Sequence, residues 1–159
     1  MSSAIILSPA HDADLRDVMR VMDSSFDPGF GEAWTIAQCA GLLPLPGVWL
    51  TLARDEDGEA VGFALARLVA DEAELLLLAV KPAGQRRGTG RILLEHFEDE
   101  AAARGASRLH LEVREGNHAV SLYEQGGFEL VGRRRDYYCG QDGDRYDALT
   151  MAKSAGNPR

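Results

Sequence analysis

Two glycines within an arginine-rich stretch are the best candidates in the sequence for binding an anion. Residues 80–91 read VKPAGQRRGTGR and join an apolar run to an amphipathic one. Because Gly88 and Gly90 lack a Cβ atom, the backbone there can come close to a ligand, and a helix that begins here would point unpaired N–H groups at it. The positive charges beside these glycines come from Arg86, Arg87 and Arg91. The stretch therefore suits a diphosphate group.

Two common nucleotide-binding motifs do not match this stretch. A P-loop that began at Gly84 would need its second glycine where Thr89 stands, and no Lys-Ser or Lys-Thr pair follows. A dinucleotide-binding fingerprint that began at Gly88 would need a glycine at Leu93, and no βαβ repeat accompanies it. On this stretch alone, a glycine-rich turn with solvated arginines stays open as the alternative.

The composition predicts one globular domain that does not bind nucleic acid. The chain has 159 residues, of which 45% are hydrophobic and 26% charged, which is enough for one compact core. Its 17 Lys and Arg residues against 25 Asp and Glu residues give a formal charge of -8. That charge repels phosphate backbones and favours a cationic substrate. We expect the domain to span residues 1–153 and residues 154–159 to form a frayed tail.

Neither a signal peptide nor a membrane-spanning segment is expected. The apolar residues 4–7 have no positive charge before them and are followed by Ser8 and Pro9. No stretch approaches the roughly 20 apolar residues that span a bilayer. Cys39 and Cys139 lie far apart without C-x-x-C spacing, which favours reduced thiols, and the four histidines lack metal-ligand spacing. We expect a cytoplasmic protein with no metal and no membrane partner.

Hydrophobic periodicity predicts an α/β fold in which helices pack on the faces of a mixed sheet. Strands are expected near residues 5–7, 48–54, 60–70, 75–80, 109–113, 128–134 and 145–151, and helices over 15–26, 34–43, 90–104 and 118–125. Asp12 is the expected N-cap of the first helix, and Asn117 that of the last. The unbroken apolar run at 75–80 is typical of a strand at the centre of a sheet. The strand order cannot be inferred from these patterns.

The order of several motifs carries a resemblance to a known family. Residues 85–90, QRRGTG, resemble the Q/R-x-x-G-x-G/A motif of the GNAT superfamily of N-acetyltransferases. Four further segments resemble its branch that acetylates protein N-termini, typified by the ribosomal-protein-alanine acetyltransferases: residues 79–82 (AVKP), 111–114 (LEVR), 122–124 (LYE) and 127–128 (GF). The likeness is good over residues 60–151 and weak over the first 50, where residues 26–35 look like a lengthened form of the branch's F-P-W-S segment.

This resemblance implies a fold, a cofactor and the residues that bind it. The GNAT-type fold has a central mixed sheet of about six or seven strands, flanked by about four helices. The co-substrate is acetyl-coenzyme A (acetyl-CoA), whose pantetheine arm fills a gap beside the central strand, where main-chain amides can polarise the thioester carbonyl. The residues expected to bind it are Leu78, Ala79, Val80, Gln85, Arg86, Arg87, Gly88, Thr89, Gly90, Arg91 and Asn117.

The same resemblance assigns an acid and a base. An amine acceptor is mostly protonated near neutral pH, so a group must take its proton, and Glu112 matches the family's base. The departing sulfur needs a proton donor, for which Tyr123 matches the family's acid. From spacing alone, Glu112 would be a solvated glutamate on a strand face and Tyr123 a core aromatic. Asn117 lies six residues before Tyr123 where the family has seven, so its role as a plain cap stays open.

We therefore expect an N-acetyltransferase that moves an acetyl group from acetyl-CoA to a primary amine by direct attack. The favoured acceptor is the N-terminal α-amine of a protein, and the expected assembly is a monomer or weak dimer. Two alternatives stay open: an enzyme that acetylates a small amine such as a polyamine or an aminoglycoside, and a non-catalytic sensor of acyl-CoA.

Overall fold

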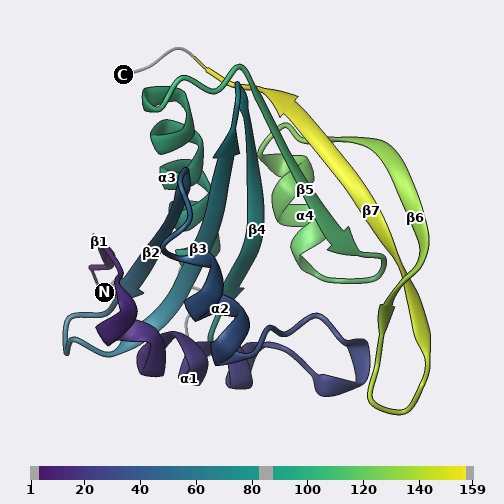
Figure 1. Cartoon of the computed structure of the whole chain (residues 1–159), viewed down its shortest axis with the longest axis horizontal. Coiled ribbons are helices and arrows are strands. Elements are labelled where there is room, and N and C mark those ends of the chain that lie inside the picture. The colour runs from purple at the N-terminus through teal and green to yellow at the C-terminus, as the bar shows by residue number, and fades with distance from the viewer. Residues whose placement is uncertain (1–3, 83–87, 157–159) are drawn as a thin grey trace.

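A computed structural model describes residues 4–82 and 88–156 and shows one mixed sheet flanked by helices (Figure 1). Its strands are β1 (Ile6–Pro9), β2 (Val48–Arg54), β3 (Ala60–Val69), β4 (Glu72–Val80), β5 (Arg108–Arg114), β6 (Glu129–Cys139) and β7 (Arg145–Ser154). Its α-helices are α1 (Leu15–Ser25), α2 (Ile36–Leu42), α3 (Thr89–Ala103) and α4 (Ala119–Gln125). The sheet order is β1-β2-β3-β4-β5-β7-β6, so the predicted mixed sheet is confirmed and β4 lies at its centre.

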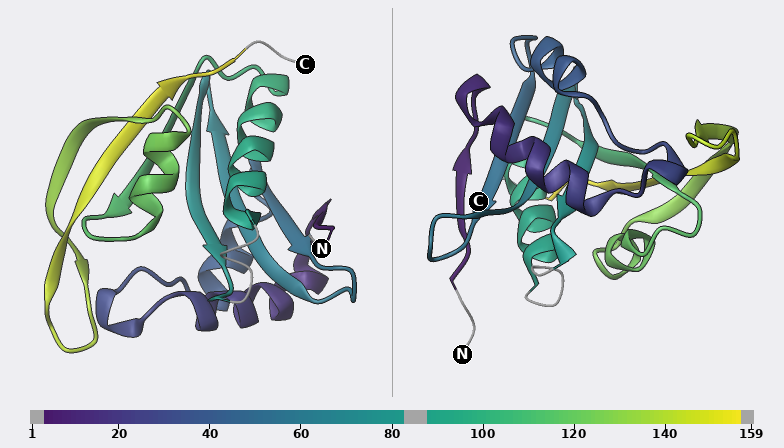
Figure 2. Two further views of the ribbon diagram at one scale, coloured as in Figure 1. Left: turned by 180° about the vertical axis from the view of Figure 1, so that it is seen from behind. Right: turned by 90° about the horizontal axis from the view of Figure 1, so that it is seen from below.

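The helices cover the two faces of the sheet in pairs. Figure 2 shows α1 and α2 on one face and α3 and α4 on the other. Each pair closes its own apolar cluster: Val18 and Met22 pack with Phe63 under α1, and Phe97 packs with Leu109 under α3. Strands β2 and β3 are thus buried on both faces over most of their length, which is what lets them be largely apolar, whereas β6 at the sheet edge is mostly exposed.

Of two local signals predicted in the first half of the chain, a turn and a helix cap, the turn is confirmed and the cap is not. The Asp55–Gly58 turn forms the predicted hairpin between β2 and β3, with Asp55 Oδ1 accepting hydrogen bonds from the amides of Asp57 and Glu59. The predicted cap of α1 at Asp12 is wrong. A 3-10 turn over Asp12–Asp14 comes before the helix, and the Asp14 carboxylate accepts a hydrogen bond from the His11 amide at 2.9 Å.

A β-bulge bends the central strand away from its parallel neighbour. Leu77 pairs with Leu65 and Leu75 pairs with Ala66, so Leu76 is one extra residue on β4. The bulge reverses the facing of the side chains, because Leu75 packs in the cluster under α3 and Leu77 in the cluster under α1. The parallel ladder of β4 with β5 spans only residues 72–75 of β4, although both strands run on. The two strands therefore separate, as Figure 1 shows.

The connection between α1 and α2 packs closely against the β6–β7 hairpin. A Cβ atom on Gly140 would lie 1.8 Å from the Gly29 carbonyl oxygen, and one on Gly31 would lie 2.1 Å from the Cys139 carbonyl oxygen. The Gln141 amide also donates a hydrogen bond to the Pro28 carbonyl. Two segments more than 100 residues apart in sequence thus form one wall beside the gap between β4 and β5.

The last strand runs one residue past position 153, where we expect the domain to end. Strand β7 ends at Ser154, and the amide of Ala155 donates a hydrogen bond to the Ser107 carbonyl at 2.9 Å. Within residues 4–82 and 88–156, no helix has the length and apolarity needed to cross a membrane.

Candidate active site

A cavity of about 580 Å³ occupies the gap where β4 and β5 separate. Its first end lies against β4, the start of α3 and the start of α4, and its second end lies against the α1–α2 connection and β6. The lining includes Leu76–Val80 of β4, Gly88, Gly90 and Arg91 at α3, Asn117 and Tyr123 at α4, Glu112 and Arg114 of β5, Phe26, Phe30, Glu32 and Trp34 of the α1–α2 connection, and Tyr137 and Tyr138 of β6. The predicted site residues within the described chain thus line one cavity, except Thr89, which is fully buried and is not part of the lining.

The first end of the cavity offers main-chain groups and a helix N-terminus. Beyond Leu75, β4 pairs with β5 no further, and no other strand among the described residues takes the place of β5, so the main-chain groups of Leu76–Ala79 face the gap on this edge. Gly88 precedes α3 with a φ of 77°, a left-handed conformation that favours glycine. The hydroxyl of Thr89, the first residue of α3, is buried and has no hydrogen-bond partner among the described residues. Gly90 has a packing reason as well, because a Cβ atom there would lie 3.2 Å from Leu122 Cδ2.

Three predicted ligand-binding residues, Gln85, Arg86 and Arg87, lie outside the described residues. The loop before α3 is therefore represented in the site by Gly88 and by the residues that follow it.

Tyr123 is buried in α4 and its hydroxyl points into the cavity. The ring packs edge-on against Phe128, with 6.1 Å between ring centroids, so it is a core aromatic as well as a lining residue. Burial, followed by the nearby Tyr138 and Glu32, raises the pKa of Tyr123 well above its ordinary value near 10. The phenol therefore keeps its proton at neutral pH and can act as a hydrogen-bond donor.

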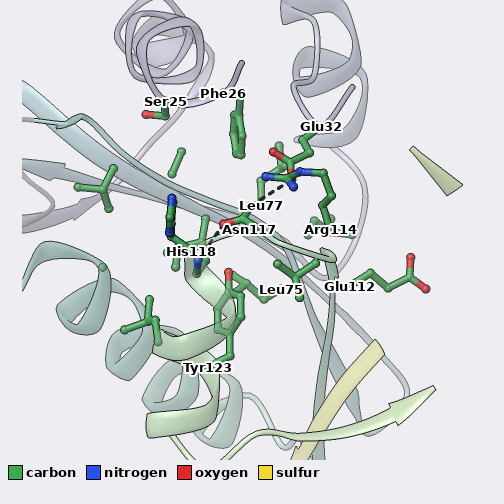
Figure 3. Close-up of a pocket in the computed structure, with 18 of the residues that line it drawn as sticks. Ser25, Phe26, Glu32, Leu75, Leu77, Glu112, Arg114, Asn117, His118 and Tyr123 are labelled. Carbon is green, nitrogen blue, oxygen red and sulfur yellow. Dashed lines mark hydrogen bonds and ion pairs between the residues drawn. The ribbon is translucent and has the colours of Figure 1, made fainter. Parts of the chain in front are cut away.

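Glu112 lies on β5 with its carboxylate turned away from Tyr123 (Figure 3). The Arg134 Nε atom lies 2.6 Å from Glu112 Oε1, and the Glu112 side chain is 14% exposed. Burial raises the pKa of Tyr137, and the charge of Glu112 and its hydrogen bond with the Tyr137 side chain add to that shift. The structure thus places Glu112 on the lining of the cavity, beside β6.

Asn117 links the start of α4 to the opposite wall of the cavity. The N-cap of α4 is His118, so the predicted cap at Asn117 is wrong by one residue. Asn117 Oδ1 nevertheless accepts a hydrogen bond at 2.8 Å from the amide of Ala119, the first residue of the helix. Asn117 Nδ2 donates a hydrogen bond to Glu32 Oε1 at 3.0 Å. The interaction with Glu32, which is 85 residues away in sequence, could not be inferred from the spacing of motifs.

Glu32 and Arg114 form an ion pair that the sequence did not indicate. Arg114 Nε donates to Glu32 Oε1 at 2.8 Å, and the guanidinium carbon lies 3.7 Å from the centre of the Phe30 ring. Both charged side chains are nearly buried, at 8% exposure for Glu32 and 11% for Arg114. Alternation along β5 indicates only that Arg114 shares a face with Glu112. Its partner depends on how the α1–α2 connection folds back over the sheet.

Irregular pairing in β6 brings two tyrosines to the second end of the cavity. Arg134 pairs with Ala148 and Tyr138 with Tyr146, which leaves extra residues on β6 between them. Asp136, within this bulge, has a φ of 53°, and its amide donates to Asp147 Oδ1. Burial is the main cause that raises the pKa of Tyr138 above its ordinary value.

Cys39 and Cys139 are free thiols, and the described residues include no cluster of acidic, His and Cys side chains that could hold a metal ion.

Comparison with known proteins identifies relatives over most of the chain. Residues 15–128 match the model of the acetyltransferase (GNAT) family. A ribosomal protein bS18-alanine N-acetyltransferase of Escherichia coli K12 is 46% identical over 105 residues, which are 65% of this chain and 70% of that one. The corresponding enzyme of Haemophilus ducreyi is 34% identical over 142 residues, which are 83% of this chain and 98% of that one.

A solved structure extends this likeness to the whole fold. The crystal structure of the ribosomal-protein-S18-alanine N-acetyltransferase from Escherichia coli covers 98% of this chain and 97% of its own, at 33% identity and a TM-score of 0.83. The family model covers more than half of the chain, and the separated β4 and β5 agree with the fold that the motifs predicted. The chain therefore belongs to the GNAT family of acetyltransferases and is an N-acetyltransferase that uses acetyl-CoA.

Proposed function

We propose that this enzyme acetylates the N-terminal α-amine of a protein, with an N-terminal alanine of a ribosomal protein as the favoured acceptor. The observation that carries the proposal is the likeness to the S18-alanine enzyme of Escherichia coli, which extends over 98% of the chain and so includes the wall formed by the α1–α2 connection. A ribosomal acceptor implies a cytoplasmic enzyme. We keep a monomer or weak dimer as the expected assembly.

The residues at the first end of the cavity fit an acyl-CoA. The edge of β4 that faces the gap can pair with an extended chain of amides, as pantetheine provides, and Leu78, Ala79 and Val80 line that edge. The first amides of α3 suit the phosphates. In the proposed binding mode Gly88, Thr89, Gly90, Arg91 and Asn117 hold the co-substrate beside these β4 residues. Gln85, Arg86 and Arg87 stay a prediction for the same role.

The proposed chemistry needs one proton removed and one supplied. Bound acetyl-CoA supplies the acetyl group as an activated thioester. Glu112 takes a proton from the acceptor ammonium, through water because its carboxylate points away from the gap in Figure 3. The freed amine forms the new C–N bond as the C–S bond breaks. Tyr123 gives its hydroxyl proton to the departing sulfur, and its raised pKa keeps that proton in place until then.

The test is an acceptor comparison with purified enzyme and acetyl-CoA. We expect acetylation of a peptide that begins with a free alanine, with the acetyl group at its N-terminus by tandem mass spectrometry, and no reaction when that N-terminus is already blocked. Spermidine is the control for a small-amine enzyme. Rapid acetylation of spermidine with an unmodified peptide would replace the proposed acceptor class, and binding of acetyl-CoA without turnover of any amine would indicate a sensor.

A further inference from the structure

Glu32 is a buried acid that the mechanism above does not use. It is 8% exposed and is the only charged residue in the described part of the chain that is this deeply buried. It follows a 3-10 turn (Pro28–Phe30) in the α1–α2 connection and lines the cavity at its second end. Burying a carboxylate is costly unless its charge and its lone pairs are matched by partners.

The partners of Glu32 occupy only one of its two oxygens. Arg114 Nε at 2.8 Å and Asn117 Nδ2 at 3.0 Å both donate to Oε1. Among the described residues no donor bonds to Oε2, and the side chain belongs to the lining of the cavity. An ionised carboxylate accepts through both oxygens, so Oε2 has unused capacity for a donor that comes from the cavity.

The surroundings hold this carboxylate in place. Its partner Arg114 is itself fixed over the Phe30 ring, 3.7 Å from the ring centre. Gly31, which precedes Glu32, lies so close to Cys139 that a Cβ atom on Gly31 would lie 2.1 Å from the Cys139 carbonyl oxygen. The side chain is thus oriented before any ligand binds, which lowers the entropic cost of binding one.

The position of Glu32 is close to the proposed proton donor. Burial is the largest cause of the raised pKa of Tyr123 and of Tyr138, and the negative charge of Glu32 contributes to both shifts. Figure 3 shows the Glu32 carboxylate and the Tyr123 hydroxyl approaching Asn117 from opposite sides, while the Glu112 carboxylate points away from all three. Of the other acids that line the cavity, Asp27 accepts a hydrogen bond from the Gly29 amide and Glu74 pairs with Arg67. Glu32 is therefore the deeply buried acid beside Asn117 and Tyr123 that a ligand in the gap can reach.

We infer that Glu32 is the acceptor-binding carboxylate, which uses Oε2 to bind the α-ammonium group of the acceptor peptide. This role rests on the proposed function and adds a determinant of specificity to it: the acceptor must present a charged primary amine at the second end of the cavity. Binding by Glu32 is a separate task from proton removal by Glu112. Arg134 and Tyr137 already hold the Glu112 carboxylate, so Glu112 is not the group that binds the ammonium directly.

Glu32→Gln tests this inference because glutamine keeps an oxygen that can accept from Arg114 and Asn117 but loses the charge. With a peptide that begins with alanine, we expect KM for the peptide to rise about tenfold or more. We expect kcat and KM for acetyl-CoA to change less than about threefold. Glu32→Asp, which keeps the charge, should recover part of the loss. Glu115→Gln is the matched control, because Glu115 pairs with Arg133 outside the cavity, and it should leave all three constants unchanged.

A binding measurement on the wild-type enzyme gives an independent test. Two peptides of the same sequence are compared as competitive inhibitors of the enzyme. One has a free N-terminal amine that reacts slowly, and the other has hydrogen in place of that amino group. We expect the wild type to bind the free-amine peptide about tenfold more tightly than the peptide without the amine, and we expect Glu32→Gln to bind the two peptides equally. An equal affinity of the wild type for both peptides would overturn the inference.

The outcomes separate this inference from the proposed function. If the wild type acetylates the alanine peptide and Glu32→Gln leaves its KM unchanged, Glu32 does not bind the acceptor and the proposed function still holds. If Glu32→Gln lowers kcat at an unchanged KM, Glu32 acts in the chemical step and the inference is wrong. If the wild type acetylates spermidine and no peptide, the proposed function fails first, and the peptide part of the inference fails with it.

Discussion

The two ends of the cavity are built in different ways. The first end, where we propose that acetyl-CoA binds and which we call the cofactor end, comes from consecutive elements, β4, α3, β5 and α4, within residues 72–125. The second end, where we propose that the acceptor binds and which we call the acceptor end, joins the α1–α2 connection to β5 and to the β6–β7 hairpin. It does so through contacts such as the Glu32–Arg114 ion pair across 82 residues of sequence. One end therefore depends on local motifs and the other on long-range packing, so changes at the two ends should have separable effects.

The largest expected effect comes from the cofactor end, at Tyr123. In Tyr123→Phe the ring still packs against Phe128, but the hydroxyl proton is gone. We expect kcat to fall about a hundredfold or more, in the range for loss of a general acid. Affinity for acetyl-CoA, measured by calorimetry, should change little. A kcat close to that of the wild type would remove Tyr123 from its proposed role and leave it as a core residue.

A smaller effect is expected from the acceptor wall, at Gly140. In Gly140→Ala the new Cβ atom would lie 1.8 Å from the Gly29 carbonyl, so the α1–α2 connection must shift. We expect a loss of about 1–3 kcal/mol in the free energy of unfolding, as for overpacking elsewhere. KM for the acceptor peptide should rise, while affinity for acetyl-CoA stays close to that of the wild type.

Gly41→Ala is the control for this variant, because nothing lies within 4 Å of a Cβ atom at Gly41. It should cost no stability and leave both substrates unaffected. If Gly140→Ala weakens the binding of acetyl-CoA as much as that of the peptide, the two ends are not independent.

Most of the framework could be predicted from the sequence, because it depends on local patterns. The alternation of Leu109, Leu111 and Val113 indicates β5, and the apolar spacing after Gly90 indicates α3; both are confirmed. The four consecutive leucines of β4 predict its central place, but they give no sign that Leu76 is the extra residue of a bulge. That choice depends on pairing with β3, a long-range contact.

The site follows the same division. The motifs indicate Gly88, Asn117 and Tyr123, which lie together on the cavity, because each belongs to a local loop or helix signal. Glu32 has no such signal: a glutamate in an irregular segment is most often solvated, and its burial follows from the packing of Gly31 on the β6–β7 hairpin. Glu112 is a mixed case, since its strand is confirmed and its role as a base stays a prediction.

A smaller effect is expected from the pH dependence of stability above pH 9, to which Tyr123 on α4 and Tyr138 on β6 both contribute. Both have raised pKa values, mainly because of burial, so the folded protein keeps protons that the unfolded chain loses above about pH 10. Their contribution to stability is therefore complete below pH 10 and is lost as the pH rises further. We expect urea unfolding between pH 9 and 11.5 to show a smaller decline for either Phe variant, by about the same amount, because both phenols keep their protons in the folded protein over this range. Equal slopes for all three proteins would contradict this.

The smallest effect is expected from Arg133, which joins the two ends at the surface. Its guanidinium pairs with Glu115, after β5, and lies 2.8 Å from Asp147 on β7. Hydrogen bonds lower the pKa of both carboxylates: the largest contribution comes from Arg133 for Glu115, and from the Asp136 amide, followed by Arg133, for Asp147. A lowered pKa gives stability that is present above the unfolded value near 4 and is lost as the pH falls through the folded one.

Arg133→Gln should therefore be slightly less stable than the wild type at pH 7 and about equally stable near pH 2, by chemical denaturation across that range. Salt should reduce the difference, because the cluster is exposed. We expect kcat and both KM values to stay unchanged, since the buried link through Glu32, Arg114 and Asn117 is sufficient to hold the acceptor wall against α4. A raised KM for the peptide in Arg133→Gln would show instead that the surface cluster also sets the position of that wall.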